Sequence, residues 1–168
     1  KTIEHSTRRI AYQIYEANFD NNVIYVVGIA KSGVLFAQSI ISFLKQISDL
    51  EIHFIQLEIN KKNSHLPIKT SVDVNVLKNQ SVVLVDDVLY TGRTIRAGLD
   101  ALLAFGRPKK VELLTMIDRR FRRDLPISAD YVGKTVDTLI SERVSVEWTE
   151  IEGEDKVVLF TQERDSNG

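Results

Sequence analysis

Two adjacent carboxylates, Asp86 and Asp87, follow an apolar run and precede a loop rich in hydroxyl groups. The loop, Tyr90 to Thr94, combines threonine hydroxyls with a flexible backbone at Gly92, and it opens an expected helix. Helix N-termini favour phosphate, because their free N–H groups and the helix dipole attract negative charge. Carboxylates in turn accept hydrogen bonds from sugar hydroxyls. The segment therefore predicts a site for a phosphorylated sugar.

The acid pair itself needs an explanation. Two ionised carboxylates side by side repel, and one tends to be protonated unless a cation or hydrogen-bond donors offset the repulsion. Ribose hydroxyls and Mg²⁺ would provide that offset. An isolated Asp-Asp is better explained as the end of a strand and the start of a turn, but the apolar run before it and the Thr-Gly-Arg-Thr after it favour a binding site. This interpretation requires that the two acids do not point into a hydrophobic interior.

The elements around the pair place it at the edge of a parallel sheet. The run from Val82 to Val85 is apolar without alternation, as in a strand covered on both faces, and the carboxyl ends of such strands face the ligand crevice. Helical spacing predicts helices over Ile3–Phe19, Gly33–Ile47 and Thr91–Phe105. Further strands are expected over Val23–Ile29, Glu51–Ile59, Val72–Leu77, Lys110–Ile117, Tyr131–Val132, Val144–Trp148 and Val157–Thr161. The alternation predicts an α/β fold, a doubly wound parallel sheet flanked by helices, with a small hood from the later strands.

Length and composition are those of one globular domain. The chain has 168 residues, 43% of them hydrophobic and 27% charged, so we expect a single domain over residues 1–161 and a disordered tail over 162–168. No apolar run approaches the roughly 20 residues that cross a bilayer, so no membrane partner is expected. The absence of cysteine excludes disulfides and thiolate metal sites and is compatible with a cytoplasmic protein. The net charge of −1 gives no overall attraction to nucleic acid.

A second glycine-bounded segment, Gly28 to Gly33, ends the first predicted strand. It is not a P-loop, because Val34 follows where a Lys-Ser/Thr pair is required, and this disfavours a nucleoside-triphosphate hydrolase. From the residues alone, the segment is either an anion-binding loop or an ordinary turn from strand to helix that carries a surface lysine.

The stretch Val82 to Thr94 resembles the 5-phosphoribosyl-1-pyrophosphate (PRPP) signature of the type I phosphoribosyltransferases in length, order and residue type. The resemblance implies that Asp86 and Asp87 act at the catalytic centre by binding the ribose hydroxyls. It implies a 5′-phosphate site formed by Tyr90, Thr91, Gly92, Arg93 and Thr94. It also implies Mg²⁺ as cofactor, held mainly by PRPP and at most by one of the two acids, and a homodimer.

The same resemblance assigns the Gly28 segment to pyrophosphate. The implied binding residues are Ala30, Lys31, Ser32 and Gly33, with a non-proline cis peptide bond at Ala30–Lys31 that costs about 3 kcal/mol. The polar stretch Asn60 to Thr70 corresponds to a mobile lid that would exclude water during the reaction.

Tyr90 stands where 6-oxopurine enzymes usually have an aspartate. The surrounding stretch, together with Ile117 to Lys134, instead resembles the bifunctional pyrimidine-operon attenuator/uracil phosphoribosyltransferase subfamily. This resemblance implies a base site formed by Asp118, Arg119 and the backbone of Val132. The implied function is transfer of the phosphoribosyl group of PRPP to a nucleobase, with uracil favoured, in nucleotide salvage.

A cluster of arginines around Phe121, from Arg119 to Arg123, leaves a second function open. Clustered arginines beside an aromatic ring are typical of RNA-binding faces, although a solvated loop partly neutralised by Asp118 and Asp124 has the same composition. The alternative hypothesis is therefore a PRPP- or nucleotide-sensing regulator that binds RNA with weak or no catalysis. A receiver-like acidic metal pocket is disfavoured by the phosphate-type loop after the acids.

Overall fold

The protein is described by a computed structural model that covers residues 2–57, 76–90, 92–119, 126–136, 142–147 and 156–161. Along the chain, its helices and strands are α1 (Thr2–Ala17), β1 (Val23–Ile29), α2 (Ala30–Ile47), β2 (Glu51–Leu57), β3 (Ser81–Leu89), α3 (Arg93–Leu103), β4 (Lys110–Arg119), β5 (Tyr131–Val136), β6 (Glu142–Glu147) and β7 (Lys156–Thr161). The predicted lid over residues 60–70 and the predicted tail lie outside the described residues.

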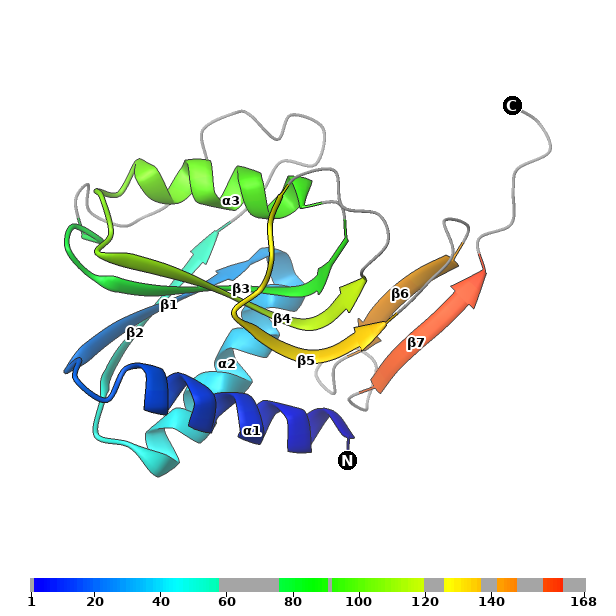
Figure 1. Cartoon of the computed structure of the whole chain (residues 1–168), viewed down its shortest axis with the longest axis horizontal. Coiled ribbons are helices and arrows are strands. Elements are labelled where there is room, and N and C mark those ends of the chain that lie inside the picture. Colours follow the sequence, from blue (N-terminus) through cyan, green and yellow to red (C-terminus); the bar gives the residue numbers. More distant parts are fainter. Residues whose placement is uncertain are drawn as a thin grey trace.

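Five parallel strands form the central sheet in the order β2-β1-β3-β4-β5. Figure 1 shows α3 on one face of this sheet and α1 with α2 on the other. β6 and β7 pair antiparallel as a separate small sheet beyond the end of β5. The predicted fold class, a parallel sheet flanked by helices with a small hood, is confirmed. None of the helices described is long and apolar enough to cross a membrane.

The core explains why β3 has no alternation of apolar and polar residues. Val83 and Val85 pack with α1 and α2, whereas Val82 and Leu84 pack on the opposite face with α3. Each apolar side chain is therefore removed from water whichever way it points, which is the reason for the continuous apolar run in the sequence.

Two boundaries differ from the prediction in ways that shape the site. β3 continues through both acids to Leu89, because Asp86 pairs with Thr115 and Leu89 with Asp118 in the ladder with β4. α2 begins directly at Ala30, three residues before the predicted start. Ladder pairing and tight packing outweigh the preference of aspartate and glycine for turns.

The other predicted elements are found at or near their expected positions. β1 matches its predicted range, and the helix before it ends two residues early at Ala17. In the predicted strand Val72–Leu77, residues 72–75 lie outside the described residues, and Val76 and Leu77 lie in a turn.

Candidate active site

The carboxyl ends of β1 and β3 meet through a glycine. A Cβ atom at Gly33 would lie 2.7 Å from the carbonyl oxygen of Val85 and 3.6 Å from Cα of Asp86, so only glycine allows α2 to approach β3 this closely. The first turn of α2 therefore touches the strand immediately before the acid pair. This contact brings the predicted pyrophosphate segment beside the predicted ribose segment, although the two are separated by about 50 residues in the sequence.

The turn into α2 is made by Ala30. Its φ is 57°, a left-handed conformation that is uncommon for a residue with a Cβ atom. All peptide bonds among the described residues are trans, so the prediction of a cis bond at Ala30–Lys31 is wrong. The physical reason is that left-handed Ala30 reverses the chain by itself, and Lys31 and Ser32 then continue directly into the helix.

The two acids occupy different environments. Asp86 is only 7% exposed, and its Oδ1 accepts a hydrogen bond from the backbone N–H of Asp87 (2.9 Å). Asp87 is half-buried, and its Oδ1 accepts from the N–H of Val88 (2.9 Å). Asp86 is thus enclosed by protein, contrary to the accessibility that the sequence interpretation requires of both acids, whereas Asp87 retains an exposed surface.

Burial has an electrostatic consequence for Asp86. Desolvation raises the pKa of its carboxyl well above the usual value, and the neighbouring charge of Asp87 raises it further. The pair therefore resists double ionisation.

The predicted phosphate loop leads into the start of α3. Gly92 is the residue before the helix and has a φ of 92°, which explains the need for glycine at this position. No side chain caps the helix, and the side chains of Arg93 and Thr94 are exposed. Thr91 lies outside the described residues. The first N–H groups of α3 thus lie in the geometry that anion sites use.

The predicted base residues fall into two groups. Asp118 and Arg119 end β4 beside the phosphate loop, and the guanidinium of Arg119 lies 3.7 Å from the ring centroid of Tyr90. Val132 is not with them. It pairs with Thr115, whereas Asp118 pairs with Thr135, so Val132 lies three residues earlier along the sheet.

Arg9 and Thr115 are site neighbours that the sequence reasoning missed. Nη2 of Arg9, on α1, donates to the carbonyl oxygens of Val132 (2.8 Å) and Gly133 (2.9 Å). The buried hydroxyl of Thr115 donates to the carbonyl of Asp87 (3.1 Å) and to that of Ile117 (3.0 Å). A polar residue within the apolar run of β4 was the one available signal for Thr115, and no sequence signal pointed to Arg9.

The acid pair is compatible with a cation held chiefly by substrate. Among the residues described, no group of three or more histidines, aspartates or glutamates surrounds a common point. Mg²⁺ prefers oxygen ligands and often binds through one or two carboxylates plus substrate phosphates and water. Asp87, the more accessible acid, fits that role, with Asp86 behind it.

Of the arginine cluster, only Arg119 is described. It is 5% exposed and stacked on Tyr90, so it belongs to the interior of the site and not to an outer surface. Arg120 to Arg123 lie outside the described residues.

Comparison with known proteins gives a consistent result. Residues 1–151 match the model of the phosphoribosyl transferase domain. A bifunctional protein PyrR of Enterococcus faecalis is 41% identical over 164 residues, which are 94% of this chain and 92% of the relative. The bifunctional protein PyrR of Streptococcus pneumoniae is 42% identical over 167 residues, 96% and 94% of the two chains.

Solved structures show the same fold at lower identity. A hypoxanthine-guanine phosphoribosyltransferase of Bacillus anthracis superposes with a TM-score of 0.70 at 22% identity, covering 85% of this chain and 80% of its own. A hypoxanthine phosphoribosyltransferase of Staphylococcus aureus gives a TM-score of 0.70 at 21% identity, covering 85% and 76%.

Proposed function

Since this chain belongs to the phosphoribosyl transferase domain family and within it to the group of the bifunctional PyrR proteins, we propose that it transfers the phosphoribosyl group of PRPP to uracil and releases pyrophosphate. One observation carries the assignment of the site. The glycine contact between α2 and β3 joins a helix start to an acid pair, and the N-terminus of α3 follows three residues after β3 ends.

Each part of PRPP has a matching group in this arrangement. The start of α2, with Lys31, receives the pyrophosphate, and the N-terminus of α3, with Thr94, receives the 5′-phosphate. Asp86 and Asp87 lie between these anion sites, where the ribose hydroxyls would fall. Asp87, which keeps an exposed surface, accepts from a ribose hydroxyl and fixes the orientation of the sugar, and Asp86 lies enclosed beside it.

Charge development accounts for the rest of the chemistry. As the bond from C1 to pyrophosphate lengthens, C1 gains positive character, and the carboxylate of Asp87 stabilises that charge electrostatically. Mg²⁺ bound to the pyrophosphate would offset the charge of the leaving group. The nucleobase nitrogen attacks C1 as the bond to pyrophosphate breaks, and its proton passes to water or to the released pyrophosphate, so no protein nucleophile is required. Alignment of base and sugar supplies most of the rate.

The base assignment rests on the similarity to the PyrR group and on Tyr90, which replaces the aspartate typical of 6-oxopurine enzymes. Arg119 and Asp118 are proposed to contact uracil. Val132 is a weaker candidate, because its carbonyl already accepts a hydrogen bond from Arg9. A role in pyrimidine salvage and assembly as a homodimer are part of the same proposal.

The test is release of pyrophosphate from PRPP and Mg²⁺ with each free base in turn. Uracil should support turnover at least about tenfold faster than hypoxanthine, guanine, adenine or cytosine, as expected when a polar site recognises one pattern of donors and acceptors. Turnover with hypoxanthine or guanine instead would correct the base. No turnover with any base would contradict the enzymatic function.

A second candidate function is regulation through RNA. The relatives named above are called bifunctional, and the cluster from Arg119 to Arg123 is a strongly basic segment of the sequence. Arg122→Ala/Arg123→Ala should weaken binding of messenger RNA in a shift assay and reduce its dependence on salt, with turnover of PRPP retained. Unchanged RNA binding in this variant would exclude the segment as the RNA site.

A further inference from the structure

The contact between Tyr90 and Arg119 joins two parts of the site to which separate roles were assigned. Leu89 and Asp118 form the last pair in the ladder between β3 and β4, so Tyr90 directly follows β3 and Arg119 is the last residue of β4. The guanidinium carbon of Arg119 lies 3.7 Å from the centroid of the Tyr90 ring, and Arg119 is 5% exposed. A cation stacked this closely and out of water is held more firmly than one at the surface.

Stacking determines which way Arg119 can donate. A guanidinium group is planar, and its N–H groups point outward from the edge of the plane, while its face is what meets an aromatic ring. A ring at this distance from the guanidinium carbon restricts the directions in which the donors of Arg119 can point.

We propose that Tyr90 is a positioning residue for base selection: its ring orients Arg119 so that the guanidinium edge donates to a carbonyl oxygen of the incoming base. The proposal rests on the proposed function and assigns Tyr90 a role other than holding phosphate. An edge composed only of donors favours a base with a carbonyl at that position and disfavours one with an amino group there, because two donors cannot pair. The site thus selects oxo-bases such as uracil over amino-bases such as cytosine.

The variants Tyr90→Leu and Tyr90→Phe separate the ring face from the hydroxyl group. Tyr90→Leu should raise the KM for uracil about tenfold, the scale of a desolvated cation–π contact, with the KM for PRPP and kcat changed less than about twofold. Tyr90→Phe keeps the ring face and should recover most of the lost affinity for uracil. The inhibition constant of cytosine and the KM for uracil should also move closer together in Tyr90→Leu.

Tyr25→Leu is the matched control. It removes another aromatic stack, the contact of Tyr25 on β1 with His53 on the edge strand β2, whose ring centroids lie 4.8 Å apart, and should leave the KM for uracil unchanged. If Tyr90→Leu does not fold, Arg119→Lys gives the second route. Lysine keeps the charge but not the planar face, and it should raise the KM for uracil to a similar extent.

Two outcomes would overturn the inference while leaving the enzyme assignment intact. One is a rise in the KM for PRPP without a change for uracil in Tyr90→Leu, which would place Tyr90 in the phosphate site. The other is equal loss in Tyr90→Leu and Tyr90→Phe, which would assign the effect to the hydroxyl group. Absence of turnover in the parent protein with every base would instead refute the proposed function, and the inference with it.

Discussion

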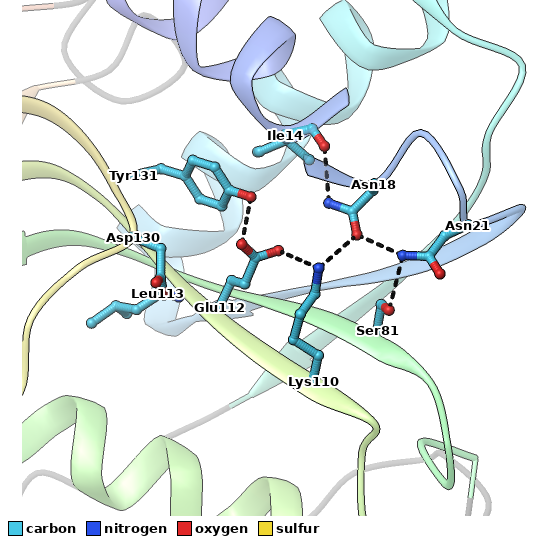
Figure 2. A network of polar contacts seen from close by, with 9 residues as sticks. All are labelled: Ile14, Asn18, Asn21, Ser81, Lys110, Glu112, Leu113, Asp130 and Tyr131. Atoms are coloured by element: carbon cyan, nitrogen blue, oxygen red, sulfur yellow. Dashed lines mark hydrogen bonds and ion pairs between the residues drawn. The ribbon is translucent and has the colours of Figure 1, made fainter. Parts of the chain in front are cut away.

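At the amino ends of β3 and β4 a network of polar side chains joins the strands to α1, whereas at their carboxyl ends two acids of like charge stand side by side. Figure 2 shows the amino-end network. Asn18 lies at its centre: its Nδ2 donates to the carbonyl of Ile14 (2.9 Å), and its Oδ1 accepts from Asn21 (2.9 Å) and Lys110 (3.4 Å). The side-chain amide of Asn18 thus has both its nitrogen and its oxygen paired.

The network continues across the sheet to β5. Nζ of Lys110 lies 3.3 Å from Oε1 of Glu112, and the hydroxyl of Tyr131 donates to Oε2 of the same carboxylate (2.6 Å). Burial and this bond to Glu112 raise the pKa of the Tyr131 hydroxyl, so it stays protonated as a donor. Contacts between buried polar side chains at the amino end thus hold α1, β4 and β5 together.

At the carboxyl end, the buried polar group Asp86 lies in an unfavourable environment. Asp86 has a like-charged neighbour in Asp87 and, nearby, the left-handed backbone of Ala30. Both features cost stability, and such features are typical of functional sites. The same pair of strands therefore stabilises the fold at its amino end and holds an energetically unfavourable site at its carboxyl end. Substitutions at the amino end should therefore lower stability and leave turnover nearly unchanged. Substitutions at the carboxyl end should lower turnover and can raise stability.

The largest expected effect is on catalysis at the carboxyl end. Asp86→Asn/Asp87→Asn should reduce turnover of PRPP by at least about a thousandfold, because it removes the charge that stabilises C1 and alters the contact of Asp87 to the ribose. Circular dichroism should show an intact fold. Turnover like that of the parent protein would remove these acids from the active site.

The next effect is on stability at the amino end. Asn18→Ala removes a buried amide and leaves its partners unsatisfied, so it should lower the free energy of unfolding by about 2–3 kcal/mol in chemical denaturation. Turnover below the unfolding transition should stay within about twofold. Gln13→Ala removes an exposed side chain of α1 and should change stability by less than about 0.5 kcal/mol. A large loss of turnover in folded Asn18→Ala would mean that the two ends are not separate.

The smallest effect is a gain in stability at the carboxyl end. Because the pKa of Asp86 is raised in the folded protein, ionisation of Asp86 opposes folding. The protonated carboxyl of Asp86 therefore stabilises the folded protein fully below the pKa that Asp86 has in the unfolded chain. This stabilisation is lost as pH rises through the pKa that Asp86 has in the folded protein. Asparagine keeps an acceptor for the Asp87 N–H and cannot ionise. Asp86→Asn should therefore be about 1–2 kcal/mol more stable than the parent at pH 8, while losing activity.

The advantage of Asp86→Asn should shrink as pH falls, and it should vanish near pH 4, where the parent protein also carries a neutral group. Urea denaturation at pH 4, 6 and 8 measures this trend. Asp100→Asn, at an exposed position on α3, is the control and should show no such trend. An advantage that grows toward low pH would contradict burial as the cause.

The sequence was sufficient to predict the fold. The continuous apolar run before Asp86 predicted a strand covered on both faces, and the loop at Gly92 predicted the break before α3. These features are local, since each depends on residue types within one or two turns of chain. The family resemblance, carried by the same residues, is confirmed by the domain match.

The remaining features depend on tertiary packing. The left-handed Ala30 and the close approach at Gly33 follow from how α2 lies against β3, and alanine has no local preference for that conformation. The burial of Asp86 depends on strands and helices distant in sequence. The bond from Arg9 to Val132 joins residues more than 120 positions apart. No spacing rule reaches across such distances.

The most direct test of the central claim, that the sugar phosphate binds at the carboxyl ends of β1 and β3, is backbone amide NMR during titration with ribose 5-phosphate. We expect saturable shifts at the amides of Gly92, Thr94 and Asp87, with the amides of Asn18 and Lys110 unchanged. Shifts confined to the amino end of the sheet, or no shift at Gly92 at millimolar ligand, would contradict it.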